Sequence, residues 1–262
     1  GEVIIRDQSI NLSNLKMDSN IGRGNMTMFY TAKDYSGASA GFDLDMEDVM
    51  VEKLIGLYPA IDTLVPMLRS FEGVVDCQVT ATCKMDSTMS LELPSLHSAC
   101  YLHGENMVLL DGETFTEISK TLMFKNKKRN VIDSISVDLA IKDNKIEVFP
   151  FLVEMDRYKV AVGGTHNLDM TFNYHLSVLK SPVPFKLGID ITGNLDDFKY
   201  KIVKCRYKDL FKPAKEAELD STRTNVRKEI RESIRNQIKE TAPELVSSLS
   251  PNHTVTPPEG ET

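Results

Sequence analysis

Apolar and polar residues alternate one by one along most of the chain between residues 133 and 209. The longest such run sets Leu168, Met170, Phe172, Tyr174, Leu176 and Val178 between polar neighbours. Successive side chains of a β-strand point to opposite faces, so a period of two gives each strand one apolar and one polar face. Only short turns separate the runs, which predicts an antiparallel meander with one continuous apolar face.

A weaker form of the same alternation predicts strands in the first half of the chain. They fall over residues 3–5, 10–17, 26–30, 38–44, 75–81, 99–103 and 107–110. Two segments between them have apolar residues at helical spacing, over residues 49–57 and 61–68, and a short helix is expected over residues 114–124, where Thr114 and Glu117 would form a capping box. The acidic residues at 45–48 are expected to mark the N-terminus of the first helix. The predicted fold is β-rich α+β: an antiparallel meander forms a bent sheet or groove, with a few helices packed on one side and a C-terminal helix.

The C-terminal helix is predicted from a charged segment over residues 214–240. Its apolar residues recur at every fourth position, as Val226, Ile230, Ile234 and Ile238. This spacing forms a narrow stripe along a helix with 3.6 residues per turn. The stripe either docks on a partner or on another copy of the chain, or folds back over a sheet edge or one end of the groove.

Three parts of the chain follow from these patterns. Residues 1–211 are predicted to form a β-rich domain, and residues 212–242 a charged helix. Residues 243–262 are polar and rich in proline, so we expect a disordered tail there.

Composition narrows the class of protein only slightly. The 262 residues are 41% hydrophobic and 26% charged, as in ordinary globular proteins. The net charge of −7 argues against nucleic-acid binding, because neutralising phosphates requires a basic surface. No stretch approaches the roughly 20 apolar residues that span a bilayer. The first residue is Gly1 and not Met, so we expect a piece cut from a longer chain, and targeting or anchoring segments would then be missing from it.

The cysteines give no sign of disulfides or of metal binding. Cys77 and Cys83 share one predicted strand and lie about 20 Å apart at the usual strand rise. A disulfide requires Cα atoms within about 7 Å. No CxxC spacing is present. We interpret these two residues, Cys100 and Cys205 as small buried apolar residues.

The sequence contains no motif of a common catalytic site. There is no G-x-S-x-G, no P-loop and no H-E-x-x-H. The pair Gly163-Gly164 lies between two predicted strands and is interpreted as a turn. We interpret the five histidines as surface residues: His97, His103, His166, His175 and His253. No catalytic, cofactor-binding or metal-binding residue is predicted, and an enzyme is the least favoured class.

Several features of the meander occur together in one known family. They are the pair Gly163-Gly164, the opening Leu168-Asp169-Met170, the strand Tyr174-His175-Leu176, the linker Pro182-Val183-Pro184 and a strand that closes at Gly193. In these features the chain resembles the C-terminal region of the AsmA-like family of bacterial envelope proteins, best over residues 101–209. The charged helix over residues 214–240 and the tail are not part of that pattern.

The resemblance implies a function without catalysis and without a cofactor. It implies a periplasmic module of a Gram-negative protein, anchored to the inner membrane by an N-terminal helix that this sequence lacks. Such proteins are similar to bridge-like lipid transfer proteins, in which phospholipid acyl chains move along an apolar β-groove during outer-membrane biogenesis. The candidate lipid-facing residues are Leu168, Met170, Phe172, Tyr174, Leu176, Phe185, Leu187 and Ile189.

Two other interpretations of the apolar positions stay open. The same residues would form an ordinary core if the helices predicted within residues 48–70 and 114–124 cover them. The chain would also fit a structural or interaction module that regulates envelope assembly through protein partners, which the stripe on the C-terminal helix would contact.

Overall fold

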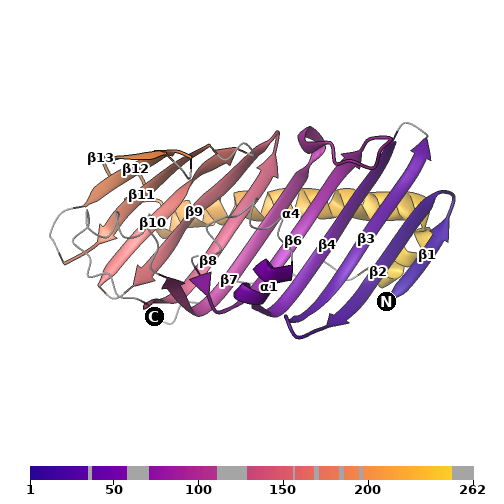
Figure 1. The fold of residues 1–262 in the computed structure, drawn as a ribbon, viewed down its shortest axis with the longest axis horizontal. Helices are drawn as coiled ribbons and strands as arrows, with labels where there is room; N and C mark the ends of the chain where they lie inside the picture. The colour runs from indigo at the N-terminus through magenta and orange to yellow at the C-terminus, as the bar shows by residue number, and fades with distance from the viewer. Residues whose placement is uncertain are drawn as a thin grey trace.

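The computed structural model describes residues 1–34, 37–57, 71–110, 129–155, 157–167, 171–182, 186–194 and 197–249. Within these residues, thirteen strands form one antiparallel open sheet (Figure 1). The strands are β1 Glu2–Arg6, β2 Ser9–Asp18, β3 Arg23–Asp34, β4 Gly37–Met50, β5 Phe71–Glu72, β6 Val74–Met85, β7 His97–Leu110, β8 Arg129–Lys142, β9 Lys145–Met155, β10 Tyr158–Asn167, β11 Phe172–Lys180, β12 Leu187–Gly193 and β13 Phe198–Val203. The helices are α1 Val51–Leu57, α4 Pro213–Thr241 and the 3-10 helices η2 Leu93–Ser95 and η3 Pro243–Ser248.

The sheet is a meander, as the alternating pattern predicts. Each long strand pairs with the next one along the chain, and the two-residue β5 pairs separately with β7. Two hairpins turn at residues with positive φ, Asp7-Gln8 before β2 and Asp143-Asn144 before β9. Tight hairpin turns require this backbone, which Asp and Asn adopt more readily than most residues. The β-rich, antiparallel prediction is confirmed, and it holds from the first strand onward.

The two faces of the sheet differ in chemistry. Residues paired directly across neighbouring strands lie on the same face. One row from β4 to β9 contains Leu44, Val79, Cys100, Leu139 and Val148. The next row from β4 to β8 contains Asp45, Gln78, Tyr101 and Asp138. We call the face with the first row the apolar face and the face with the second row the polar face.

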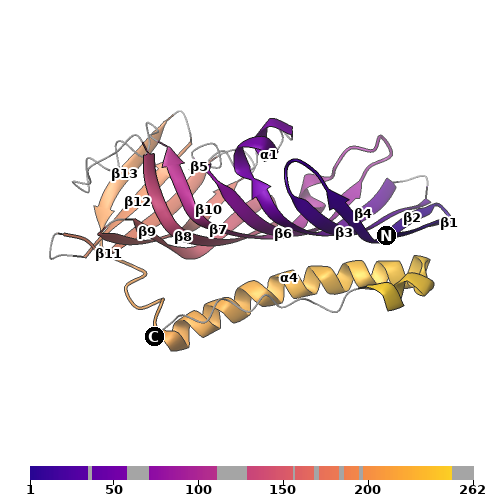
Figure 2. The same ribbon diagram turned by 90° about the horizontal axis from the view of Figure 1, so that it is seen from below.

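The long helix α4 lies along the polar face. Figure 2 shows it beneath the sheet, running from the connector after β13 back toward the N-terminal strands. It packs on β2, β3, β4, β6, β7 and β8. Ile230, Ile234 and Ile238 form a buried cluster with Phe29 and Ala99, and Val226 packs against that cluster. The stripe that was a candidate for partner docking thus contacts the chain's own sheet.

The apolar face is covered over part of its length by α1. Val51 and Leu54 of this helix join a cluster with Val75 and Ile135, and Figure 2 shows α1 on the side of the sheet opposite α4. The two main helices therefore lie on opposite faces, whereas the sequence predicted helices on one side. The helices predicted over residues 61–68 and 114–124 lie outside the described residues.

The start of α1 differs from the prediction. Residues 45–48 belong to β4, which continues to Met50 through a shift of register between Met46 and Val49. Asp48 has a φ of 56° at this bulge. Val49 then pairs with Val75 and is fully buried. The apolar residues on both sides of the bulge keep the chain in the sheet, so the acidic residues do not begin a helix.

The glycine pair is not a turn. Gly163 and Gly164 lie inside β10, and so does His166, which was also expected in a turn. A Cβ on Gly163 would lie 2.9 Å from the Pro150 Cα, and one on Gly164 would collide with the Asn173 carbonyl. Glycine here permits a close approach of the two neighbouring strands, which is the other common use of glycine within a strand.

Candidate functional site

The apolar face forms one continuous surface that crosses the sheet. Its central row consists of Leu15, Met26, Leu44, Val79, Cys100, Leu139, Val148, Gly164, Tyr174, Ile191 and Tyr200, each paired directly with the next. We call this set the apolar row. It extends from β2 to β13, a distance of about 48 Å at the ordinary spacing between strands. No charged residue interrupts it.

Burial does not separate the two faces as their chemistry would suggest, because part of the apolar face stays accessible to water while several polar side chains on the other face are buried. Most of the apolar row is only half-buried, and Tyr200 at its end is 48% exposed. On the polar face, Asn11 and Thr80 are fully buried at 0% exposure. An exposed apolar surface of this extent is uncommon on a monomeric protein and marks a binding surface.

Five of the eight residues predicted to face lipid lie within the described residues, and all five lie on the apolar face. They are Phe172, Tyr174 and Leu176 of β11 and Leu187 and Ile189 of β12. Leu176 pairs with Ile189, and the rings of Phe172 and Tyr174 are 5.9 Å apart. Ile189 is buried, whereas the other four are half-buried. Leu168, Met170 and Phe185 lie outside the described residues.

Burial also affects the phenol of Tyr174 on this face. Desolvation raises its pKa to about 12, and its hydroxyl lies 3.4 Å from Nδ1 of His166. The phenol is neutral at physiological pH even at its ordinary pKa of about 10, so this part of the apolar row carries no charge.

The sequence predicted lipid-facing residues only between residues 168 and 189, whereas the apolar row begins in β2. The row includes Leu15, Met26, Leu44, Val79 and Cys100 from the first half of the chain. These residues show the same period of two as the later strands, so the signal was present. Their place on the same face follows only from the register, which a single sequence does not specify.

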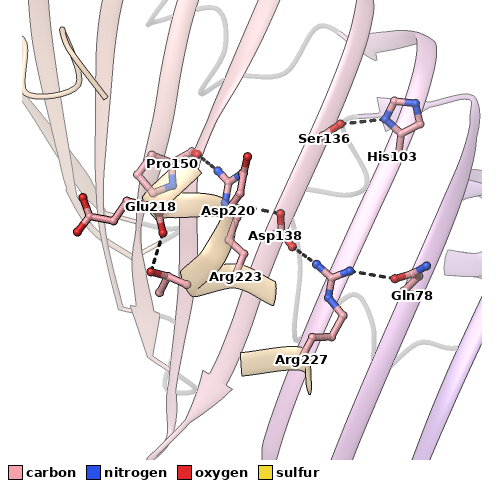
Figure 3. A network of polar contacts seen from close by, with 10 residues as sticks. Gln78, His103, Ser136, Asp138, Pro150, Glu218, Asp220, Arg223 and Arg227 are labelled. Carbon is pink, nitrogen blue, oxygen red and sulfur yellow. Dashed lines mark hydrogen bonds and ion pairs between the residues drawn. The ribbon is translucent and has the colours of Figure 1, made fainter. Parts of the chain in front are cut away.

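Three arginines attach α4 to the polar face, and Figure 3 shows two of them, Arg223 and Arg227. Arg223, Arg227 and Arg231 are spaced one helical turn apart. Arg227 Nη2 lies 2.6 Å from Asp138 Oδ1, and its guanidinium stacks 5.1 Å from the centre of the Tyr101 ring. Arg223 Nε lies 3.6 Å from the other oxygen of Asp138.

The third arginine pairs with the acidic residues of β4. Arg231 Nε lies 2.8 Å from Asp43 Oδ1, and its Nη2 lies 3.2 Å from Asp45 Oδ1. Asp45 was expected at a helix N-terminus, and together with Asp43 it instead holds α4 in place. Burial raises the pKa of Asp43, and the same cause raises the pKa of Asp138, although the arginines act in the opposite direction.

A buried histidine fixes the connector between β13 and α4. His175 is 2% exposed, with Nδ1 2.6 Å from Asp190 Oδ1 and Nε2 2.9 Å from Ser177 Oγ. The backbone amides of Arg206 and Tyr207 donate to Ser177 Oγ at 3.1 and 3.0 Å. His175 was predicted as a surface residue. That prediction is wrong, because the connector covers this part of the polar face.

Asp190 contacts His175, and His175 contacts Ser177, as the carboxylate, imidazole and hydroxyl groups do in a Ser-His-Asp catalytic triad. In this chain Ser177 is fully buried at 0% exposure, and its oxygen accepts two backbone amides. The arrangement therefore binds the connector and leaves no space for a substrate at the hydroxyl. It also directs the chain onto the polar face, where α4 follows.

The remaining histidines and the cysteines do not form a second site within the described residues. His97 is exposed, His103 is half-buried and contacts Ser136, and His253 lies outside the described part. All four cysteines are free thiols, of which only Cys77 is buried, and burial raises its pKa to about 11. No group of three possible metal ligands occurs there, and no described helix is long and apolar enough to cross a membrane.

No protein-family model matches the chain, and no curated protein and no solved structure is significantly similar to it. The candidate site is accordingly defined by geometry alone: an apolar surface across the sheet, on the face opposite α4.

Proposed function

We propose that this chain is a non-enzymatic lipid-handling module whose apolar face binds phospholipid acyl chains along a bent β-groove. The observation that supports this proposal is the apolar row, which runs uncharged from β2 to β13 on the face opposite α4. A hydrocarbon chain needs no directed hydrogen bonds, and burial of each CH₂ contributes about 0.8 kcal/mol. An uncharged surface without polar anchors suits such a ligand.

The dimensions of the row also suit acyl chains. Two acyl chains end to end span the hydrocarbon core of a bilayer, which is about 30 Å thick. The apolar row is longer than that, so more than one chain can lie along it, or a single chain can change position without leaving apolar surroundings. The half-buried state of most of its residues leaves apolar surface to be removed from water on binding.

The place of action in this proposal is the periplasm of a Gram-negative bacterium. A helix outside this sequence would anchor the whole protein to the inner membrane, and lipid would pass toward the outer membrane during its biogenesis. The resemblance of residues 101–209 to the AsmA-like family supports this part of the proposal.

An interaction module that regulates envelope assembly is the second candidate. The feature that favoured it, the apolar stripe of α4, is occupied by the chain's own sheet, since Ile234 and Ile238 are 2% and 0% exposed. Partner binding through this stripe would require α4 to leave the polar face and expose three arginines together with their carboxylate partners. We therefore favour the lipid-handling function.

Lipid binding can be tested with a matched pair of variants on one strand. Leu176→Asp places a charge on the half-buried apolar face of β11, whereas Asn173→Asp places the same charge on an exposed position facing the other side. Each purified protein is incubated with vesicles of phosphatidylethanolamine and phosphatidylglycerol and then separated from them. Mass spectrometry of the extracted lipid gives the lipid-to-protein ratio.

We expect bound phospholipid on the wild type and on Asn173→Asp, and a clearly lower ratio on Leu176→Asp. Circular dichroism confirms that both variants keep the sheet. A wild-type protein that carries no lipid after this treatment would overturn the proposal, and so would an equal loss in both variants.

A further inference from the structure

Both ends of the sheet are open within the described residues. β1 pairs only with β2, and β13 pairs only with β12. The outer backbone groups of such edge strands are available to another strand. The large apolar side chains at these edges are also among the most exposed of the apolar face: Val3 at 54%, Ile5 at 73%, Tyr200 at 48% and Ile202 at 61%. The apolar face thus continues to both edges, and no described strand lies beyond either of them.

The number of strands determines how two copies can join. Twelve strands form the path from β1 to β13, with β5 outside it, and each pair is antiparallel. β1 and β13 therefore run in opposite directions. When two copies have the same orientation, β13 of one copy and β1 of the next are antiparallel, both apolar faces point to the same side, and both α4 helices lie on the other side.

The charges at the two edges are complementary in one register. With Val3 opposite Tyr200 and Ile5 opposite Phe198, the apolar side chains meet on the apolar face. The same register places Glu2 opposite Lys201 on the polar face. Both of these residues are exposed, and opposite charges directly across a strand pair favour pairing. Arg6 would then lie opposite Asp197, although Arg6 already contacts Glu244 at 2.9 Å.

We propose that β13 of one copy pairs with β1 of a second copy in this register and joins two apolar faces into one longer surface. Pairing of β13 with another β13 is disfavoured, because Lys199 and Lys201 would meet the same lysines of the other copy. This pairing depends on the sheet edges and not on lipid, so it stands or falls separately from the lipid-handling function.

A charge exchange on the full chain tests the pairing. The variants are Lys201→Glu, Glu2→Lys and the double variant, with Lys201→Arg as the conservative control. Sedimentation velocity over a range of concentrations measures their association. We expect each single charge reversal to weaken association about two- to tenfold, as reversal of one cross-strand charge pair allows. The control and the double variant should associate like the wild type.

Mixing the two single variants gives a further expected result. The carboxylate introduced by Lys201→Glu in one protein would face the ammonium group introduced by Glu2→Lys in the other. The unchanged edges stay complementary, so the mixture should associate more strongly than either variant alone. A wild type that stays monomeric overturns the proposal. Association that Lys201→Glu leaves unchanged also overturns it, because contact through the apolar faces or between two β1 edges does not involve Lys201.

Discussion

At the scale of single residues, this molecule buries polar side chains as completely as apolar ones. Asp138 lies between Arg223 and Arg227 at 3.6 and 2.6 Å, under a helix that excludes water. Burial of a carboxylate costs free energy even when cations are near. The polar contacts therefore specify where α4 lies, whereas its isoleucines supply the apolar contacts that keep it there.

The pH dependence of stability should reveal the burial of Asp138. Burial raises the pKa of this carboxyl group in the folded chain. The folded state then holds the proton more tightly than the unfolded state, so this residue stabilises the fold increasingly as the pH falls through the raised pKa, and less as the pH rises. Asp138→Asn removes this titration. As the pH is lowered from 7 to about 4, the free energy of unfolding of the wild type should therefore rise relative to that of Asp138→Asn.

Urea denaturation at a series of pH values measures this difference, because effects of all other groups cancel between the two proteins. Asp133→Asn on the same strand is the control, since its side chain is exposed. If the difference in free energy of unfolding between the wild type and Asp138→Asn does not change with pH, or if it favours the variant at low pH, the pKa of Asp138 is not raised in the folded state.

At the scale of elements, α4 lies across the strands of the polar face and holds them together. Its stripe and its arginines serve the same contact, which joins strands that are far apart in sequence. Arg231 and Asp43, for example, are 188 residues apart. Arg6 of the first strand also donates to the Thr241 carbonyl at the end of α4, at 2.9 Å.

Removal of apolar contacts at the end of α4 should destabilise the whole chain. Ile238 is fully buried against the sheet, so Ile238→Ala should lower the free energy of unfolding by about 2–5 kcal/mol. Ser233→Ala lies on the exposed side of the same helix and should change it by no more than about 0.5 kcal/mol. Thermal and urea unfolding measure both values. Equal effects of the two substitutions would show that α4 is not docked in solution.

The sequence predicted local structure well and the arrangement of the elements poorly. Alternation predicted the strands, and the spacing of Ile230, Ile234 and Ile238 predicted α4, because both patterns are local. The face on which α4 lies depends on distant partners such as Asp43 and Asp138. The environment of His175 depends in the same way on the connector that covers it. Gly163 was misread because a glycine pair marks a turn as readily as a close approach of strands.

At the scale of the whole molecule, the sheet is held together mostly by contacts between neighbours. α4 packs on β2, β3, β4, β6, β7 and β8 and so ties these strands to one another. Beyond them, the main attachment on the polar face is the connector held by His175 and Ser177. The local stability of the sheet is therefore expected to decrease from the strands on which α4 packs toward β13.

Hydrogen exchange should follow this gradient. The amides of β4, β6, β7 and β8 have strands on both sides and α4 across one face, so they should exchange most slowly. Those of β1 and β13 should exchange fastest among the strands. Mass spectrometry of peptides after exchange measures the order. Equal protection from β4 to β13 in a monomeric sample would contradict the bracing role of α4.

The contact between Arg6 and Glu244 has a consequence for how the chain is made. These residues are 238 positions apart, so this contact of the first strand can form only after α4 and the residues that follow it have been synthesised. Until then Asn11, Asp43 and Asp138 are exposed to water, because the strands form before α4 covers the polar face. Contacts of such long sequence separation form slowly. Docking of α4 on the polar face should accordingly be a late step in the folding of residues 1–249, after the strands have paired with one another.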